Sequence, residues 1–354
     1  MILAYYPGCS LRHSSEELDH ATRQVLAALD VEFEEVPDWT CCGSTPAHMM
    51  DHLLAQALAA RNLRQASQVS DELLAPCPSC FQREKNAALE IHESDAFRAE
   101  VNEVLDKPYT GQVTCYSLPE YLMKFVGVEK IASSVKTDLS QLKVVPYYGC
   151  LLGRPTELTD ETDPEQPMAM DLLLQAAGVD VKWWNYKTEC CGASVGMPKE
   201  EIQRTLSGKV LEQALVAGAE AVVVCCPLCH VNLDLRQSQI NKALGTDYHV
   251  PILYLPQVLG LAFGMTADEV MLSKNIVDPE PLIKRVIAEA AAIKAEEERK
   301  AAEKAAKAAA REAAARSAEA PSAEASPRTA KTGAGGEGAG AGGGSEGADE
   351  EVAP

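Results

Sequence analysis

The chain has 354 residues, of which 46% are hydrophobic and 24% are charged, and this is the composition of a folded globular protein. Its formal net charge is −20, and a body this acidic repels nucleic-acid backbones and anionic lipid. No stretch approaches the ~20 apolar residues that cross a bilayer, and the first ten residues lack the pattern of a secretory signal. We therefore expect a cytoplasmic protein that binds no nucleic acid and does not insert directly into a membrane.

The first part of the chain alternates short strands with helices. Residues 1–6 (MILAYY) read as a buried strand, residues 14–30 show helical periodicity, and residues 31–36 (VEFEEV) alternate as a strand does. A helix is expected after the CCG sequence at 41–43, and residues 71–80 (DELLAPCPSC) read as a strand, a turn and the start of another helix. This order predicts an open α/β unit.

The second part of the chain shows the same order again. Residues 142–148 (LKVVPYY) read as a strand, 167–178 as a helix stopped by glycine, and 179–184 (VDVKWW) as a second strand. Residues 219–229 (AEAVVVCCPLC) then read as a strand followed by a turn. A Pro- and acid-rich loop at 154–167 has no counterpart in the first part.

Ten of the twelve cysteines repeat at fixed spacing. Each half has one cysteine, then a CCG doublet, then a C-x-x-C pair. The first set is Cys9, Cys41, Cys42, Cys77 and Cys80, and the second is Cys150, Cys190, Cys191, Cys226 and Cys229. The last four members are offset by 149 residues, and such agreement indicates a duplicated domain.

The repeat predicts the organisation of the whole chain. We expect an α/β protein of two pseudo-twofold-related repeats at 1–135 and 140–270, each a small, open, mostly parallel sheet with flanking helices. Residues 271–320, rich in Ala, Glu and Lys, are expected to form a helical extension, and the Gly-rich residues 321–354 a disordered tail.

The cysteines of each set follow predicted strands. The carboxyl ends of parallel strands meet at one edge of a sheet, so cysteines distant in sequence can converge there. Adjacent side chains on a strand point to opposite faces, but Gly43 and Gly192 permit the sharp turn that would bring both sulfurs of each doublet to one site.

Metal binding is the expected use of these thiols, because cytoplasmic thiols are kept reduced and seldom form a disulfide framework. A structural zinc site takes four ligands, whereas each half offers five. An iron–sulfur cluster is built on cysteine thiolates and can be held by distant loops. The pattern favours iron–sulfur clusters, with zinc as the alternative.

Several other residues have both a structural and a functional interpretation. Cys115 and Cys225 lie outside the repeated set and are expected to be buried packing residues. His48 and His230 could donate a proton to a leaving thiolate, although a structural histidine is the favoured interpretation.

Aromatic and basic residues flank both sets. Trp39, Trp183 and Trp184 precede the doublets and are expected to shield the site from water. Arg12 and Arg154 each follow the first cysteine of a set and could balance cluster charge or hold an anionic substrate, or be ordinary surface residues. No nucleotide-binding glycine motif occurs.

The two five-cysteine motifs, together with CPLCHVNLDLRQ (226–237) and VPILYLPQVLGLAFGM (250–265), resemble the B subunit of heterodisulfide reductase over about residues 1–270. The resemblance implies that each motif holds a non-cubane [4Fe-4S] cluster. The first cluster would then be bound by Cys9, Cys41, Cys42, Cys77 and Cys80, and the second by Cys150, Cys190, Cys191, Cys226 and Cys229.

The resemblance also implies a function and partners. A disulfide substrate would lie between the two clusters, and one electron from each would cleave its S–S bond. The chain has no C-x2-C-x2-C-x3-C run of its own. Electrons would therefore come through a ferredoxin-like C subunit and a flavin-containing A subunit of the same complex.

Two further functions remain open at this point. The same motif occurs in electron-transfer iron–sulfur subunits of lactate, glycolate and succinate dehydrogenases. A zinc-stabilised scaffold that binds partners through its acidic surface and helical tail is the non-enzymatic alternative.

Overall fold

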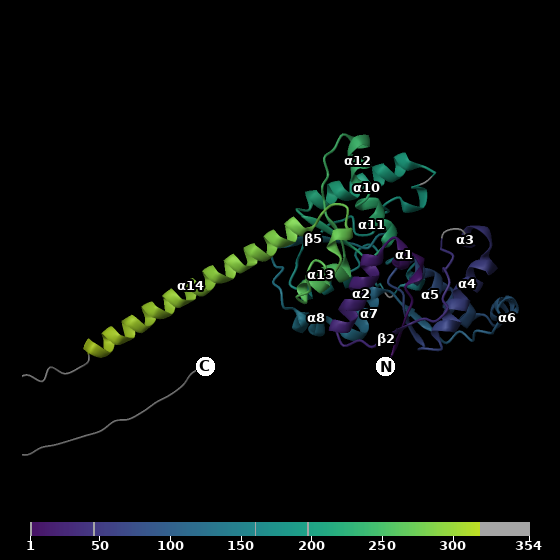
Figure 1. The fold of residues 1–354 in the computed structure, drawn as a ribbon, viewed down its shortest axis with the longest axis horizontal. Helices are drawn as coiled ribbons and strands as arrows, with labels where there is room; N and C mark the ends of the chain where they lie inside the picture. The colour runs from purple at the N-terminus through teal and green to yellow at the C-terminus, as the bar shows by residue number, and fades with distance from the viewer. Residues whose placement is uncertain (1, 45–46, 160, 197, 319–354) are drawn as a thin grey trace, which may run out of the picture. The chain divides into compact units, whose positions relative to one another are not determined.

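A computed structural model describes the chain except residues 1, 45–46, 160, 197 and 319–354 (Figure 1). The predicted Gly-rich tail at 321–354 therefore lies outside the described residues. The chain divides into two compact units, Met1–Glu297 and Glu298–Pro354, and the first contains both cysteine repeats. The boundary expected between the two repeats near residues 135–140, and the one expected near residue 270 at the end of the second repeat, stay predictions.

The first repeat alternates strands and helices, as its sequence predicts. Its described elements in chain order are β1 (Leu3–Tyr5), α1 (Gly8–His13), α2 (Glu16–Ala28), β2 (Phe33–Glu35), α3 (Ala47–Met50), α4 (His52–Ala66), β3 (Glu72–Leu74), α5 (Pro78–Glu93), α6 (Asp95–Val104), β4 (Thr114–Tyr116), α7 (Leu118–Tyr121), a π-helical turn (Leu122–Val126) and α8 (Val128–Ser134).

The second repeat follows the same plan. Its described elements are β5 (Lys143–Tyr147), α9 (Ala169–Ala176), β6 (Asp180–Val181), α10 (Glu200–Val216), β7 (Ala221–Val224), α11 (Pro227–Leu233), α12 (Gln237–Leu244), β8 (Ile252–Tyr254) and α13 (Leu255–Ala262), with short 3₁₀ turns at Thr156–Leu158, Ala193–Val195 and Leu272–Lys274.

The two sheets have the same topology. The strand order is β2-β1-β3-β4 in the first sheet and β6-β5-β7-β8 in the second. Every ladder of the described strands is parallel; Ala4, for example, lies opposite Leu73, and Val145 opposite Val222. Helices cover both faces of such sheets and bury the central strands. In the central strands β1 and β7 every residue is buried. The predicted α/β architecture of two equivalent parallel sheets is confirmed.

The sequence prediction missed one strand in each repeat. These are β4 and β8, the fourth strands of their sheets. Each leads into a helix with a closed first turn: Ser117 and Glu120 form a capping box at α7, and Gln257 Oε1 accepts a hydrogen bond from the N–H of Tyr254 at the start of α13. At most one residue separates the end of each of these strands from the start of its helix, so no turn divides the two patterns in the sequence.

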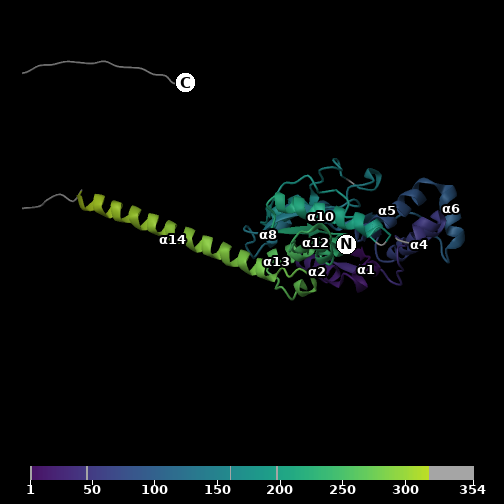
Figure 2. The same cartoon turned by 90° about the horizontal axis from the view of Figure 1, so that it is seen from above.

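The repeats pack on each other through equivalent helices. Helix α2 of the first repeat packs on α13 of the second, and α9 of the second packs on α7 and α8 of the first. Figures 1 and 2 both show α2 beside α13. Since α2 corresponds to α9 and α13 to α7, the contacts are reciprocal, as a pseudo-twofold axis requires.

Helix α14 (Glu280–Ala318) forms the predicted helical extension. Its first turns bury Ile283, Val286 and Ala290, whereas the side chains described beyond them are nearly all exposed. Among the described residues, no helix has both the length and the hydrophobicity to cross a bilayer.

Candidate functional site

A tyrosine at the end of the first strand of each repeat holds the CCG loop. The Tyr6 hydroxyl donates a hydrogen bond to the carbonyl oxygen of Thr40 at 2.7 Å, one residue before the first doublet. In the second repeat the Tyr147 hydroxyl donates to the carbonyl oxygen of Glu189, again one residue before the doublet. The same strand end therefore positions both loops.

The five cysteines of the first set come from three segments of the chain, at the start of α1, in the CCG loop and at the start of α5, and meet in pairs. The Sγ atoms of Cys9 and Cys41 lie 3.7 Å apart, and those of Cys42 and Cys80 lie 3.5 Å apart. Cys77 is the N-cap residue of α5 and is hydrogen-bonded to Cys80. Cys9 and Cys41 are exposed and the other three are buried, so the set runs from the surface into the core.

The second set repeats this geometry. The Sγ atoms of Cys191 and Cys229 lie 3.5 Å apart, and Cys150 is hydrogen-bonded to Cys190. Cys226 is the N-cap residue of α11, as Cys77 is of α5. The structure thus brings together, within each repeat, the cysteines that the sequence spacing grouped.

Two glycines in each repeat allow the cysteine sulfurs to approach one another. Gly43 and Gly192, directly after the doublets, have φ of +72° and +80°, which confirms the predicted sharp turn. A Cβ atom on Gly8 would lie 2.8 Å from Cys80 Sγ, and one on Gly149 would lie 3.1 Å from Cys229 Sγ. The turn after the first strand of each repeat therefore passes so close to a cysteine sulfur that glycine is the residue that fits there.

The pKa of the first cysteine of each doublet is lowered below its usual value. The side-chain hydrogen bond with Cys42, helped by the N–H of Gly43, lowers the pKa of Cys41 to about 5 against the effect of burial. The hydrogen bond with Cys150, with the N–H of Gly192 3.3 Å from the sulfur, lowers the pKa of Cys190 to about 6. Thiolate is the form in which cysteine binds a metal.

A cavity of about 680 Å³ lies beside the second set and is lined by residues of both repeats. All five cysteines of the second set are among its lining residues: Cys150, Cys190, Cys191, Cys226 and Cys229. The first repeat contributes residues next to its own cysteines, including Ser44 after the doublet and Ser79 within the C-x-x-C turn. We call this space the cysteine cavity.

Buried polar networks that sequence reasoning missed support the loops. In the first repeat, Asn62 accepts a hydrogen bond from the N–H of Thr40 at 2.8 Å and donates to Glu84 at 3.0 Å. Burial raises the pKa of Glu84, whose Oε2 has no hydrogen-bond partner among the described residues. In the second repeat, Ser207 and Asn232 instead donate to the carbonyl oxygen of Cys191, at 2.8 and 3.3 Å.

A buried ion pair holds the turn that carries Cys150. Lys187 is fully buried, and its Nζ lies 2.8 Å from Asp171 Oδ1 and 3.0 Å from the carbonyl oxygen of Pro167. Asp171 also accepts a hydrogen bond from Tyr148, and the carbonyl oxygen of Lys187 accepts one from the N–H of Gly149. A lysine in a loop gives no sequence signal of burial, because lysines are mostly exposed.

The two histidines singled out in the sequence lie in different environments. His230 is buried, stacked on Tyr254 and 3.1 Å from the carbonyl oxygen of Ile252, and burial lowers its pKa to about 4. It is therefore structural, as the favoured interpretation held. His48 is exposed and lines the cysteine cavity.

The predictions for the tryptophans are only partly confirmed. Trp184 is buried and donates to the carbonyl oxygen of Pro146, and Trp39 is half-buried against Tyr6. Trp183 is 67% exposed, so its expected shielding role is wrong: the next residue, Trp184, takes the inward position on the short strand end.

The remaining flanking residues are peripheral to the cavity. Arg12 and Arg154 are ion-paired with Glu35 and Glu165 and are not among the residues described as lining the cysteine cavity, which fits their surface interpretation. Cys115 and Cys225 are both fully buried in the sheets, as predicted for packing residues. The arginines that do line the cavity, Arg83 and Arg236, were not identified from the sequence.

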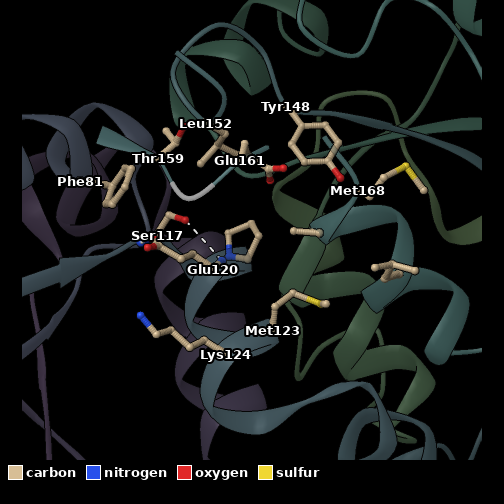
Figure 3. Close-up of a pocket in the computed structure, with 13 residues that line it drawn as sticks. Phe81, Ser117, Glu120, Met123, Lys124, Tyr148, Leu152, Thr159, Glu161 and Met168 are labelled. Carbon is tan, nitrogen blue, oxygen red and sulfur yellow. Dashed lines mark hydrogen bonds between the residues drawn. The ribbon is translucent and has the colours of Figure 1, made fainter. Parts of the chain in front are cut away.

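A second cavity, of about 390 Å³, also lies between the repeats and shares Tyr148 with the first (Figure 3). Phe81, Met123, Leu152 and Met168 give it a largely apolar lining. No cysteine is among the described residues that line it, so the cysteine cavity is the candidate functional site.

The family model described as "Cysteine-rich domain" (CCG) matches residues 3–83 and 144–234, which contain the two cysteine sets.

Curated relatives match along nearly their whole length. The chain is 30% identical over 282 residues to the 8-methylmenaquinol:fumarate reductase membrane anchor subunit of Wolinella succinogenes, covering 79% of this chain and 98% of that protein. It is 29% identical over 300 residues to the B subunit of a ferredoxin/F420H2-dependent CoB-CoM heterodisulfide reductase of Methanosarcina acetivorans, covering 82% and 99%. "Lactate utilization protein A 2" of Bacillus cereus is 22% identical over 245 residues, covering 69% and 91%.

A solved structure shares the fold. The crystal structure of a hypothetical protein from Helicobacter pylori matches with a TM-score of 0.64 and 13% identity, over 78% of this chain. The chain spans 52% of the length of that structure. The chain thus belongs to the CCG cysteine-rich-domain family that includes the B subunit of heterodisulfide reductase.

Proposed function

We propose that the chain is the iron–sulfur subunit of a heterodisulfide reductase-type complex and reduces a disulfide to two thiols. Its two clusters would be of the [4Fe-4S] type, non-cubane as in the family. The first would be held by Cys9, Cys41, Cys42, Cys77 and Cys80, and the second by Cys150, Cys190, Cys191, Cys226 and Cys229. The observation that carries the proposal is that all five cysteines of the second set line one cavity.

The donor set supports a cluster over a single ion. Five soft thiol ligands per site exceed the four of a structural zinc, whose sulfurs all lie about 2.3 Å from the metal. No three His, Cys, Asp or Glu side chains among the described residues are arranged as ligands of one ion. A cavity of about 680 Å³ beside the sulfurs has room for a larger group and a small molecule.

The chain's own residues would hold the reacting groups. A bound cluster supplies single electrons, and reduction of a disulfide to two thiols consumes two electrons and two protons. His48 lines the cysteine cavity together with the cysteines of the second set. Its imidazole can donate a proton to a leaving thiolate. Leu151 and Leu228 line the same space and help to exclude water from it.

Electrons would reach these sites from partner subunits. The relatives in Methanosarcina are named as subunits of reductase complexes. We assign a ferredoxin-like C subunit and a flavin-containing A subunit as partners, because the sequence has no ferredoxin-type cysteine run of its own.

A second function is favoured by one observation. The relative that is 30% identical is named as part of a fumarate reductase, and others are named for lactate utilization. The same two cysteine sets could then pass electrons within a complex of the fumarate reductase or lactate, glycolate or succinate dehydrogenase type, with no disulfide as substrate.

One experiment separates the two functions. The protein is purified anaerobically with its neighbouring subunits, and iron, acid-labile sulfide and EPR spectra are measured during titration with small disulfides. An EPR change on adding a disulfide, with release of two thiols, supports the reductase. Clusters that ignore every disulfide but are reoxidised through a partner by fumarate support the second function. Zinc in place of iron would exclude both.

A further inference from the structure

The second cavity, of about 390 Å³, lies at a place where the other repeat has a tyrosine. Ser117 lines the cavity and is the N-cap residue of α7, whereas Tyr254 is the N-cap residue of α13. The sequences that contain them, YSLPEYL (116–122) and LYLPQVL (253–259), align with each other, and each begins in the fourth strand of its sheet. A small serine therefore stands in the first repeat where the second repeat has a large aromatic ring.

In the second repeat the tyrosine ring rests on another ring. Tyr254 and His230 are stacked, with ring centroids 4.3 Å apart and ring planes 10° apart. His230 directly follows the C-x-x-C motif, and the residue in this position of the first repeat is Phe81. Phe81 lines the second cavity together with Ser117 (Figure 3). The first repeat thus keeps the aromatic partner but has serine in place of the tyrosine that would cover it.

The rest of the apolar lining suits an aromatic ring. Met123 and Met168 both line the cavity, and methionine sulfurs contact aromatic rings favourably (Figure 3). The ammonium group of Lys85 lies 5.2 Å from the centre of the Phe81 ring, but Lys85 is not among the described residues that line this cavity. An apolar cavity of about 150 Å³ is enough to bind benzene, so a ring with a substituent fits here.

A carboxyl group gives this cavity its polar character. Glu161 belongs to the loop at 154–167, which the first repeat lacks, and is among the residues that line the cavity (Figure 3). Burial raises the pKa of Glu161, and the charges of Asp171 and Glu120 add to this effect. A carboxyl group accepts hydrogen bonds, so Glu161 suits a ligand that carries a hydroxyl donor and disfavours an anionic ligand.

The position that holds Tyr254 also has a phenol near a carboxyl group. Burial raises the pKa of Tyr254, and the charge of Glu17 on α2 adds to this effect. Glu17 is itself buried. The second repeat therefore surrounds its own phenol with a ring and a carboxyl group, and the second cavity offers the same two kinds of group, Phe81 and Glu161, to a ligand.

We propose that the second cavity binds a substituted phenol, with its ring on Phe81 and its hydroxyl donating a hydrogen bond to Glu161. The ligand takes the place that the side chain of Tyr254 has in the second repeat. Tyr148 lines both this cavity and the cysteine cavity, but no cysteine is among the described residues of this one. Binding of the phenol therefore requires neither a bound cluster nor a disulfide.

One rival explanation is that the second cavity is a packing gap that takes up any apolar molecule of suitable size. In that case a hydroxyl group on the ligand would add no affinity, because burying a polar group without a partner is unfavourable. A phenol site predicts the opposite order of affinities, so matched compounds separate the two explanations.

The test uses three compounds that share an ethylphenyl group: 4-ethylphenol, 4-ethylanisole and 4-ethylbenzoate. The anisole has a methyl ether in place of the hydroxyl and donates no hydrogen bond. Binding to the anaerobically purified full chain is measured by calorimetry. The phenol should bind about tenfold or more tightly than the anisole, and the benzoate most weakly, because its carboxylate would face Glu161.

Matched variants assign the binding to this cavity. Glu161→Gln should remove most of the difference between the phenol and the anisole. Glu157→Gln is its control, since Glu157 lies in the same loop but is exposed and outside the described lining. Ser117→Tyr copies the residue of the second repeat and should abolish binding by filling the cavity, whereas Ser117→Ala should keep it.

The outcomes are distinct. Equal affinities for the phenol and the anisole, or an unchanged preference in Glu161→Gln, would overturn the proposal. Binding that persists in Ser117→Tyr would place the ligand elsewhere and would overturn it too. Melting temperatures show whether Ser117→Tyr is folded, and Glu161→Gln decides the question if it is not. A chain with zinc in place of iron that still prefers the phenol would overturn the proposed cluster function and leave the phenol site standing.

Discussion

The Sγ atoms of Cys42 and Cys80 lie 3.5 Å apart although 38 residues separate the two cysteines along the chain. Cys191 and Cys229 repeat both the distance and the separation. Each repeat therefore builds its own site with the same geometry, and each site can be perturbed while the other serves as an internal reference.

Replacing one buried cysteine should empty one site only. Cys42→Ser or Cys191→Ser removes a buried thiol ligand, and the protein should then retain about half of its iron, since the other repeat keeps its five cysteines. Iron and acid-labile sulfide per chain measure this result.

The control for this prediction is Cys225→Ala. Cys225 is equally buried, but its Sγ lies 3.9 Å from the sulfur of Met170, a packing partner outside the two cysteine sets. This variant should keep its full iron content and lose only packing stability. An equal loss of iron from Cys225→Ala would mean that burial, rather than ligation, explains the effect.

A methyl group on Gly8 should disturb the first site directly. Gly8→Ala places a Cβ atom 2.8 Å from Cys80 Sγ at a φ of +66°, so the variant suffers both backbone strain and a clash with a ligand sulfur. We expect a loss of unfolding free energy of about 1–2 kcal/mol from the strain alone, together with reduced iron in the first site.

Gly178→Ala separates strain from clash. Gly178 has a φ of +78°, but nothing lies within 4 Å of the added Cβ. The melting temperature of the Gly178→Ala variant should fall because of a similar backbone strain, while the iron content of this variant is unchanged. If both variants lose iron alike, the close approach of Gly8 to the sulfur has no role.

Removing one partner of the buried ion pair between Lys187 and Asp171 should destabilise the protein strongly. Replacing both residues with apolar ones should destabilise it less. Lys187→Met leaves a buried carboxylate without its cation, and the expected loss of unfolding free energy is roughly 3–5 kcal/mol. The double variant with Asp171→Leu should lose less than the sum of the single variants, because no buried charge then remains. Anaerobic urea unfolding measures the cycle.

A more exposed ion pair provides the comparison. Lys182 and Asp180 lie 2.6 Å apart, but each side chain is about one-third exposed. Lys182→Met should therefore cost less than about 1 kcal/mol. Similar losses from Lys182→Met and Lys187→Met would contradict the importance of burial.

Glu17 should make stability depend on pH. Burial raises the pKa of this carboxyl above its usual value, so the native state binds more protons than the unfolded state between the two pKa values. Stability should therefore fall as pH rises through that interval. In Glu17→Gln the fall should be smaller, as measured by urea unfolding at several pH values from about 4 to 8.

Glu16→Gln is the matched control for Glu17. Glu16 precedes it on α2, but its side chain is 49% exposed and pairs with Lys274. This variant should keep most of the pH dependence of the unaltered chain, because burial raises the pKa of Glu17 more than the neighbouring charge of Glu16 does. A Glu17→Gln variant with the same pH dependence would assign the effect to another group.

The repeat, the sheet edge and the grouping of the cysteines were predictable from the sequence because each depends on local patterns. The buried strand at Leu3–Tyr5 and the turn at Gly43 are set by residues within a few positions of them. The cavity lining depends instead on how α5 and α11 are placed when the two repeats pack. Arg83 looks like an ordinary helix residue until that packing is known.

Other parts of the site escaped prediction for similar reasons. Lys187 is buried because Asp171, sixteen residues away, meets it in the core, and spacing alone does not reveal such a pairing. Trp183 and Trp184 are adjacent, and only the path of a short strand end decides which one turns inward. Arg83 and Asn232 are aligned by the 149-residue offset of the repeat, but the offset alone does not reveal that both line the cysteine cavity.

The most direct test of the account is the metal content of the anaerobically purified chain. Two five-cysteine sets that each hold a four-iron cluster predict about eight irons and a matching amount of acid-labile sulfide per chain, in a brown protein. A colourless protein with about two zinc ions per chain and no sulfide would contradict the account.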